Sequence, residues 1–353
     1  MKEFYVNQKP FTFQDKFWRI SQDFFDSWNG EIKENETFFN SEYMDSGLDI
    51  LFSIEGNKIP FHEKYKNISK QMSLSYWDVL PKFEKDNIIN SYRNAVSSEY
   101  SREFLEFYIR TQRVFKTFSS FRMPTNIEDR WLKGCDENGI TKEIKYSRTS
   151  TVTGRLKVIS GPEILTINRT IRDNFLPLNP ENVLISIDFS ALEPNISLVE
   201  QGLLPLEDPY TELVKKGWCQ DRKEAKIMTM LSMYMSDIDP IKNPKNFLIK
   251  KFYFNFKIFS DVKKNKRNKY GRKLLTEDEN LFESHYVQSM GVDLTIDTFD
   301  AFVEDFKGFF EPKYILHDAL VGECKESMKD EILHWFKNFE KNIYGVPFPV
   351  KIS

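Results

Sequence analysis

Two short apolar runs that each end in an aspartate constrain the fold of this chain most strongly. The segment NVLISIDFS (182–190) is rich in β-branched and apolar residues, which predicts a buried strand ending at Asp188. The segment KYILHDALVGECK (313–325) predicts a hairpin whose turn lies at His317 and Asp318. Alone, each aspartate is most simply a turn residue or a strand cap. On neighbouring strands, the two carboxylates could hold two Mg²⁺ ions roughly 3.5–4 Å apart, an arrangement suited to in-line phosphoryl transfer.

A second pattern places two cations on one face of a predicted helix. In QDRKEAKIMTMLSMYMSD (220–237), Arg222, Lys226, Met230 and Tyr234 are spaced four residues apart, so they lie near one stripe of an α-helix. The guanidinium could bind terminal phosphates as a bidentate fork, and the ammonium could bind them as a point charge. Taken alone, an exposed helix with incidental lysine and arginine is the simpler interpretation.

Composition limits the class of protein. A chain of 353 residues is long enough for a large core and two or three lobes. Its three cysteines have no pairing or metal-ligand spacing, and with four scattered histidines they give no indication of a zinc site. The N-terminus has no long apolar run, so we expect neither a signal peptide nor a membrane span, and a cytoplasmic location.

The predicted elements alternate between strand and helix in the second half of the chain and are mostly helical in the first. This pattern predicts an α+β catalytic lobe with helical appendages. The segments are a mostly helical region over 10–130, a strand over 139–158 with a turn at Gly154, helices over 208–237 and 281–306, an amphipathic helix over 326–342, and a final strand in VPFPVKIS.

Taken in order, these residues resemble the motifs of the DNA polymerase I family (family A polymerases). Motif A of the family is similar to IDFSALEPN (187–195), and motif C is similar to LHDAL (316–320). Motif B, on the fingers helix, has the spacing of Arg222, Lys226 and Tyr234. Further matches are TVTGRL (151–156), IRDNF (171–175), YGRKLL (270–275), and Gln288 followed by Asp293. The resemblance covers roughly residues 100–353.

The resemblance implies an α+β, right-hand polymerase fold, with an antiparallel palm sheet, a helical thumb and condensed helical fingers. It implies a template-directed DNA polymerase that adds dNTPs to a primer 3′-OH with two Mg²⁺ ions and has no 3′–5′ exonuclease domain of its own. The implied division is an N-terminal segment (1–67), a thumb-like helical region (68–125), a palm (126–196 and 276–353) and fingers (197–275).

The resemblance also implies roles for individual residues. Glu193 matches the glutamate that closes over the sugar and excludes a 2′-OH. The implied catalytic and metal-binding groups are Asp188 and Asp318, with the carbonyl of Phe189 as a further metal ligand. The implied nucleotide-binding residues are Arg222, Lys226, Met230, Tyr234, Glu193 and Tyr210. The implied primer–template contacts are Arg155, Gln288, His317, Arg272, Lys263 and Lys264.

The last three of these lie in the basic segment DVKKNKRNKYGRK (261–273), between the implied fingers and the returning palm. A formal net charge of −3 argues weakly against nucleic acid, but the distribution of charge matters more than its sum. A basic run alone is usually a solvated loop. Its place in the family favours contact with template phosphates.

Departures from the family pattern keep other functions open. Met230 stands where the family has Phe, and single-subunit phage RNA polymerases also have Met at this position. Ala319 stands where motif C has Glu. The alternatives are therefore a related RNA polymerase or primase-like nucleotidyltransferase, or a non-catalytic replication scaffold derived from a polymerase. Expected partners are primer–template DNA and dNTPs, with a separate exonuclease, clamp or processivity subunit acting in trans. Such a stand-alone core is typical of a phage or mobile element, which would place it in the bacterial host cytoplasm.

Overall fold

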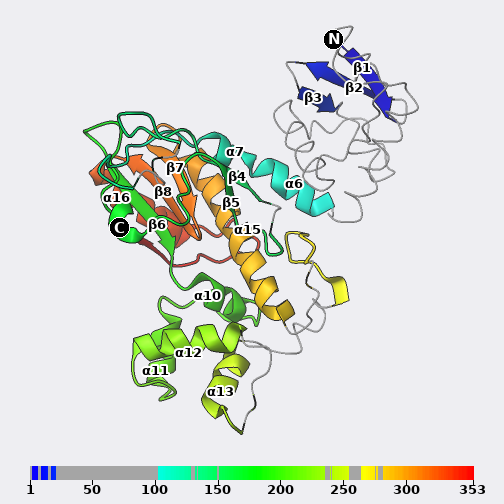
Figure 1. Cartoon of the computed structure of the whole chain (residues 1–353). Coiled ribbons are helices and arrows are strands. Elements are labelled where there is room, and N and C mark those ends of the chain that lie inside the picture. Colours follow the sequence, from blue (N-terminus) through cyan, green and yellow to red (C-terminus); the bar gives the residue numbers. More distant parts are fainter. Residues whose placement is uncertain are drawn as a thin grey trace. The chain divides into compact units, whose positions relative to one another are not determined.

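The structure is a computed structural model of the chain, and it divides into two compact units, Met1–Gln112 and Arg113–Ser353 (Figure 1). The residues that it describes are 2–6, 9–14, 17–20, 102–128, 132, 134–148, 151–234, 239, 241–253, 264–274, 276 and 281–353. None of the helices in this described part is both long and apolar enough to cross a membrane.

The first unit contains a three-stranded antiparallel meander. Its strands are β1 (Lys2–Val6), β2 (Lys9–Gln14) and β3 (Phe17–Ile20), in the order β1-β2-β3. The prediction of helix from residue 10 onward is wrong over β2 and β3. The reason is visible in KPFTFQ, where aromatic and polar residues alternate with the period of two that favours a strand. Helix α6 (Arg102–Arg110) agrees with that prediction, and residues 21–101 lie outside the described part.

The second unit is built on a four-stranded antiparallel sheet with the order β7-β8-β6-β9. Its strands are β6 (Val183–Phe189), β7 (Phe310–Leu316), β8 (Ala319–Cys324) and β9 (Val350–Ile352). The predicted strand through Asp188, the hairpin and the final strand are all confirmed, as is the mixture of helix and sheet expected of an α+β fold. Strand β6 is central in this sheet, paired with β8 on one side and β9 on the other.

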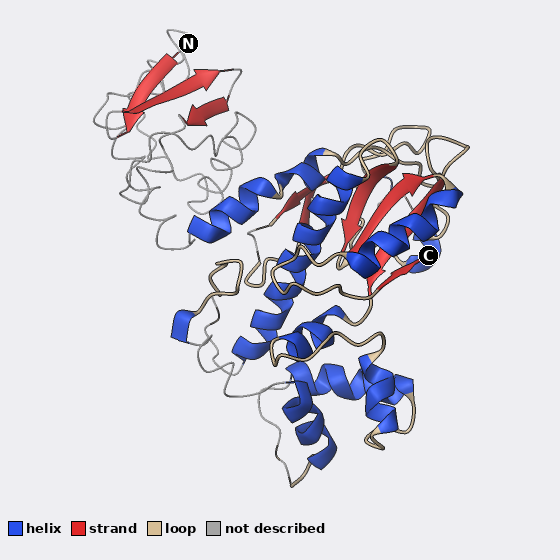
Figure 2. Cartoon of the chain, turned by 180° about the vertical axis from the view of Figure 1, so that it is seen from behind, coloured by secondary structure: helices blue, strands red, loops and turns tan. Residues whose placement is uncertain are grey.

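Two helices cover one face of this sheet, α15 (Phe282–Asp305) and α16 (Lys329–Asn338), as Figures 1 and 2 show. Their contact with the sheet is aromatic. Phe189 of β6 stacks on Phe299 of α15 with ring centroids 5.5 Å apart, and Phe336 of α16 meets Phe189 edge-on at 6.3 Å. Aromatic pairs of this kind add specific geometry to the burial of large apolar area. Helix α15 is thereby fixed against the strand that carries Asp188.

The opposite face of the sheet is covered by residues from the first half of the unit. The short elements there are α7 (Gln112–Lys116), β4 (Lys145–Ser147), β5 (Lys157–Ser160) and α9 (Arg169–Arg172). One buried cluster joins these segments to the sheet: Phe121, Met123, Ile144, Val158, Ile164, Ile167, Phe175, Tyr314 and Val321. The sheet is therefore packed on both faces, and its ends are a place where functional groups can reach solvent.

A separate group of helices follows β6 along the chain. These are α10 (Leu192–Val199), α11 (Pro209–Lys215), α12 (Arg222–Tyr234) and α13 (Pro244–Tyr253). The single helix predicted over 208–237 is thus two helices, α11 and α12. The break follows from Gly217, whose φ of +70° ends α11 in a left-handed turn.

Two other predicted elements are also divided. The strand predicted over 139–158 is the pair β4 and β5, with Gly154 at a φ of +75° in the turn between them, as predicted. The helix predicted over 326–342 is a 3₁₀ turn, Glu326–Met328, followed by α16, which ends at Asn338. Sequence periodicity placed these segments correctly and overestimated their length.

Candidate active site

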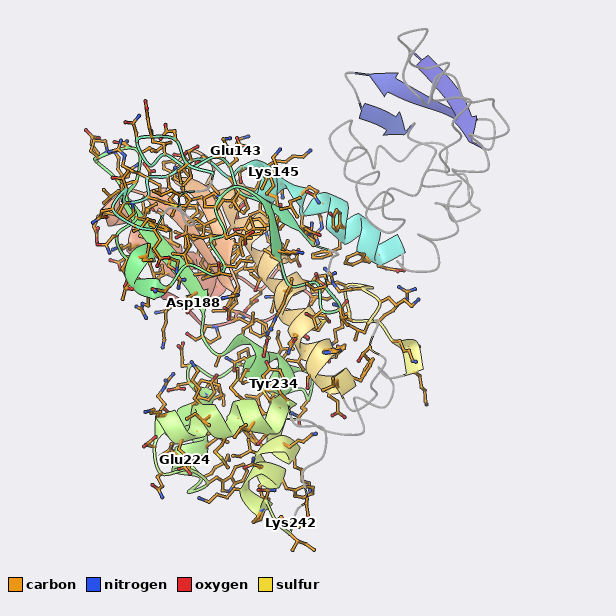
Figure 3. All side chains as sticks on the ribbon, in the orientation of Figure 1. Glu143, Lys145, Asp188, Glu224, Tyr234 and Lys242 are labelled. Atoms are coloured by element: carbon orange, nitrogen blue, oxygen red, sulfur yellow. The ribbon has the colours of Figure 1, made fainter. Side chains whose placement is uncertain are left out.

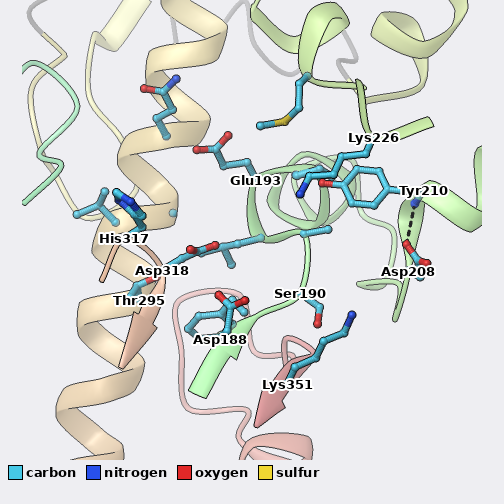
Figure 4. Close-up of a pocket in the computed structure, with 18 of the residues that line it drawn as sticks. Asp188, Ser190, Glu193, Asp208, Tyr210, Lys226, Thr295, His317, Asp318 and Lys351 are labelled. Carbon is cyan, nitrogen blue, oxygen red and sulfur yellow. Dashed lines mark hydrogen bonds between the residues drawn. The ribbon is translucent and has the colours of Figure 1, made fainter. Parts of the chain in front are cut away.

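A cavity of about 630 Å³ opens at the end of the sheet in the second unit (Figure 4). Its size falls within the range typical of sites for small ligands. Side chains from β6, the β7–β8 turn, β9, α10, α12 and α15 line it. The residues predicted from sequence that line it are Arg155, Asp188, Phe189, Glu193, Tyr210, Arg222, Lys226, Met230, Gln288, His317 and Asp318. Residues far apart in the sequence therefore form one site.

The two aspartates lie at the same end of the sheet. Asp188 is near the end of β6, as Figure 3 shows, and it is the register partner of Ala319, the first residue of β8. Asp318 precedes Ala319 in the hairpin turn, and the backbone N–H of Phe189 donates to the Asp318 carbonyl at 3.4 Å. The antiparallel ladder thus brings both carboxylates into one cavity.

Strained backbone occurs beside each aspartate. His317 has a φ of +57° and Ala191 has a φ of +49°, a left-handed conformation that is uncommon for residues other than glycine. His317 begins the turn that presents Asp318, and Ala191 begins α10 three residues after Asp188. Such strain persists only where the surrounding structure enforces it, and it concentrates at functional sites.

Electrostatics couple the two acids. Burial, together with the nearby charge of Asp188, raises the pKa of Asp318 to about 7. Burial also raises the pKa of Asp188, which Lys351 and Lys226 partly oppose. Two carboxylates that disfavour joint ionisation are a suitable place for a cation, because a cation restores the charged form of both.

The donor set fits Mg²⁺ in this respect. Asp188, Asp318 and Phe189 line the cavity, and carboxylate and backbone carbonyl oxygens are the ligands that Mg²⁺ prefers. Within the described ranges, no group of three or more His, Cys, Asp or Glu residues has metal-binding geometry. A magnesium site here would therefore use one or two carboxylates together with water and ligand oxygens, as Mg²⁺ sites at phosphates commonly do.

Helix α12 places its cations toward the cavity, as the four-residue spacing predicted. Arg222, Lys226 and Met230 line the cavity from one face of the helix. The Arg222 guanidinium is held in position, because its Nε lies 2.6 Å from a carboxylate oxygen of Asp208 and its carbon lies 5.3 Å from the centre of the Tyr210 ring. Asp208 also accepts from the backbone N–H of Tyr210 at the start of α11. The cationic face is thereby joined to α11.

Glu193 contacts two other predicted site residues. Its carboxylate accepts a hydrogen bond from the hydroxyl of Tyr234 and forms an ion pair of 3.2 Å with Arg155. Tyr234 itself does not line the cavity, so it acts on the site through Glu193. Burial raises the pKa of Glu193, and the neighbouring charge of Arg155 opposes that rise.

The basic segment divides into different environments. Lys264 is exposed, and Lys263 lies outside the described residues. Arg272 is only 3% exposed, and its guanidinium pairs with both carboxylate oxygens of Asp293 at 2.6 and 2.8 Å. It also packs against Gly154, where an added Cβ would lie 2.3 Å from the guanidinium carbon. Arg272 thus forms a buried ion pair inside the protein and does not line the cavity, and its contact with primer–template stays a prediction.

Lys351 and Thr295 are two of the lining residues that were not predicted from sequence. Lys351 of β9 is the register partner of Asp188, a pairing that no local pattern could indicate. Thr295 of α15 is 1% exposed, and its hydroxyl has no hydrogen-bond partner among the residues that the structure describes. A threonine within a long buried helix normally indicates only packing.

Comparisons with known proteins give limited further information. The sequence matches no protein-family model, and no curated protein matches it either. Among solved structures, one similar chain is the POL domain of Pol1 from M. smegmatis in complex with DNA primer–template and dNTP. The identity is 14% and the TM-score 0.43, over 89% of this chain and 64% of that chain. This chain thus spans less than two thirds of that neighbour, and the likeness is too low to assign an activity.

Proposed function

We propose that this chain is a template-directed DNA polymerase of the DNA polymerase I family. The observation that carries the proposal is the meeting of Asp188 and Asp318 with Arg222 and Lys226 in one cavity. Carboxylates that can hold metal and cations that can hold a triphosphate are the two requirements of nucleotidyl transfer. In this proposal the sheet is part of the palm, α11 to α13 belong to the fingers, and the predicted thumb precedes the palm in the chain.

The reaction would join a primer 3′-OH to the α-phosphorus of a dNTP. A new P–O bond forms there, the bond between the α- and β-phosphates breaks, pyrophosphate leaves, and the hydroxyl proton passes to solvent. Asp188, Asp318 and the Phe189 carbonyl would hold two Mg²⁺ ions, which when bound supply Lewis-acid activation of the attacking oxygen and stabilisation of the leaving group. Arg222 and Lys226 would orient the terminal phosphates.

The remaining side chains suit substrate selection. Glu193 and Met230 line the cavity, where they would meet the sugar and the base of the incoming nucleotide. Arg155, Gln288 and His317 also line it and would contact the primer–template. A bulky carboxylate held by Tyr234 and Arg155 would exclude a 2′-OH from the sugar site, so we assign dNTP rather than rNTP preference.

The second candidate is an RNA polymerase or primase-like relative. One observation favours it: Met230, where the family has Phe, faces the cavity, so the change falls at the proposed substrate site. A third candidate is a non-catalytic scaffold. The joint presence of both aspartates and both α12 cations in one cavity argues against that candidate, because a scaffold has no need of them.

In the polymerase proposal, proofreading would be supplied by a separate exonuclease. A clamp or processivity subunit would be a further partner in trans.

Primer extension separates the three candidates. A labelled primer–template is incubated with Mg²⁺ and either dNTPs or rNTPs, with wild type and Asp188→Ala in parallel. We expect extension with dNTPs by wild type and none by Asp188→Ala. Preference for rNTPs would favour the second candidate. Extension with neither dNTPs nor rNTPs would favour the third candidate, the non-catalytic scaffold.

A further inference from the structure

Lys351 lies beside the aspartate pair through a long-range strand pairing. Strand β9 is antiparallel to β6, and its register sets Lys351 directly opposite Asp188. Directly opposite residues in such a pair point to the same face, with Cβ atoms about 4.5–5.5 Å apart. Because Asp188 faces the cavity, Lys351 must do so too, and it is among the residues that line it. Figure 4 shows it reaching into the cavity from β9.

The row across the sheet is asymmetric in charge. On the other side of Asp188, the register partner is Ala319, a buried methyl group. The row Ala319–Asp188–Lys351 therefore contains one acid and one cation. It contains no second carboxylate that could form an ion pair with Lys351. The lysine is exposed, while its neighbour Val350 is buried and anchors the strand.

The cations of the cavity differ in whether a carboxylate already holds them. Arg222 is paired with Asp208 at 2.6 Å, and Arg155 with Glu193 at 3.2 Å. Within the described part of the chain, neither Lys351 nor Lys226 has a carboxylate oxygen within ion-pair distance. Lys351 lowers the pKa of Asp188 without closing a salt bridge to it. Its ammonium is thus positioned for an anion that enters the cavity.

We propose that Lys351 is a further phosphate-binding residue of this site, which holds the terminal phosphates of the incoming nucleotide and then the leaving pyrophosphate. This inference rests on the proposed function. Lys226 approaches from α12 and Lys351 from β9, so the two ammonium groups would hold the phosphates from two different elements (Figure 4). An ammonium suits this role because it is a point charge on a flexible stem, able to follow the phosphates as the bond breaks.

Binding of inorganic pyrophosphate in the presence of Mg²⁺ tests this directly. Isothermal titration calorimetry compares wild type with Lys351→Ala, Lys351→Arg and the control Lys307→Ala, an exposed lysine in the turn after α15 that does not line the cavity. We expect the Kd to rise about tenfold in Lys351→Ala, to return to within about threefold in Lys351→Arg, and to stay unchanged in Lys307→Ala. Thermal unfolding checks that each variant is folded.

Equal pyrophosphate affinity in wild type and Lys351→Ala, or no binding by wild type, would overturn the inference. If Lys351 serves only as a counter-charge for Asp188, its loss would lower the Mg²⁺ concentration needed for half-maximal extension and leave the pyrophosphate Kd unchanged, which also overturns it. The binding measurement needs no primer. If wild type binds pyrophosphate through Lys351 but extends no primer, the polymerase proposal is wrong and the phosphate-binding role of Lys351 stands.

Discussion

The hydroxyl of Tyr234 donates a hydrogen bond to the carboxylate of Glu193, which joins the last turn of α12 to the first turn of α10. The same carboxylate holds Arg155 of the turn after Gly154. Three segments of the chain therefore position one acid at the mouth of the cavity. A side chain held from two sides cannot swing away to admit a larger ligand.

Substrate choice should depend on this arrangement. In Glu193→Ala, we expect the ratio of dNTP to rNTP incorporation, measured as kcat/KM, to fall by at least about tenfold, which corresponds to ~1.4 kcal/mol of discrimination. Tyr234→Phe keeps the ring and removes only the hydrogen bond, so it should lower the ratio less. An unchanged ratio in Glu193→Ala would show that this residue does not meet the sugar.

Stability should depend on Arg272 more than DNA binding does. Its removal leaves Asp293, which is fully buried, without its guanidinium partner. Breaking a buried pair from one side typically costs ~3–5 kcal/mol. We expect the free energy of unfolding of Arg272→Ala, from urea titration, to fall by that order. The double variant Arg272→Met/Asp293→Leu should recover part of the loss, because it removes both charges.

A different result would support the predicted contact of Arg272 with DNA. If Arg272→Lys is as stable as wild type yet binds primer–template more weakly, with a smaller dependence of log Kd on log salt, then the side chain contacts phosphate after all. Loss of one phosphate contact lowers that slope by about 0.9.

The exposed lysines of the basic segment should carry the salt dependence. Lys264 and Lys266 are both exposed. If they face template phosphates, Lys264→Glu/Lys266→Glu should weaken primer–template binding and reduce the salt slope by about two. Fluorescence anisotropy at several salt concentrations measures both quantities. Lys307→Glu is the control for net charge, and an unchanged slope in the double variant would mark the segment as a solvated loop.

Protonation of Glu323 at acid pH should lower the free energy of unfolding. This carboxylate, 2% exposed, lies 3.0 Å from the fully buried ammonium of Lys313 and also accepts from Asn182 and two backbone N–H groups. Burial alone would raise the pKa of Glu323, but these donors outweigh it and hold the pKa below its usual range. Its contribution to stability is therefore present above the unfolded pKa of about 4.3 and is lost as pH falls through the lower folded pKa.

The matching experiment compares Glu323→Gln with Glu311→Gln by urea unfolding from pH 7 to about pH 3. Glu311 also lies 3.0 Å from Lys313, but its side chain is 53% exposed. We expect Glu323→Gln to cost ~3 kcal/mol at pH 7, with a difference from wild type that shrinks as pH falls below about 4.3. The exposed Glu311→Gln should cost less than about 1 kcal/mol. A cost for Glu323→Gln that does not vary with pH would refute this account.

Local patterns predicted the parts of the site that local structure determines. Asp188 was found because a β-branched run ends there, and Asp318 because the hairpin turn begins one residue earlier. The spacing of Arg222, Lys226 and Met230 predicted a shared helix face, which the cavity confirms. Each of these depends on neighbours within a few positions.

The features that sequence reasoning missed depend on contacts across long separations. Lys351 enters the site only through its register with Asp188, which local sequence does not encode. Arg272 looked like one more cation in a basic run, and its burial depends on Asp293 in a different element, α15. Thr295 gives no signal because a hydroxyl in a buried helix is ordinary. Tertiary packing, rather than local propensity, determines all three.

The central claim is that Asp188 and Asp318 act together on one reaction. Single-turnover primer extension at saturating dNTP and Mg²⁺ tests it with wild type, Asp188→Asn, Asp318→Asn and the double variant. We predict that each single variant loses at least about 10³-fold in rate and that the double variant is no slower than the slower single variant, because groups that act as a unit are not additive. A rate within tenfold of wild type for either single variant, or losses that multiply in the double variant, would contradict the claim.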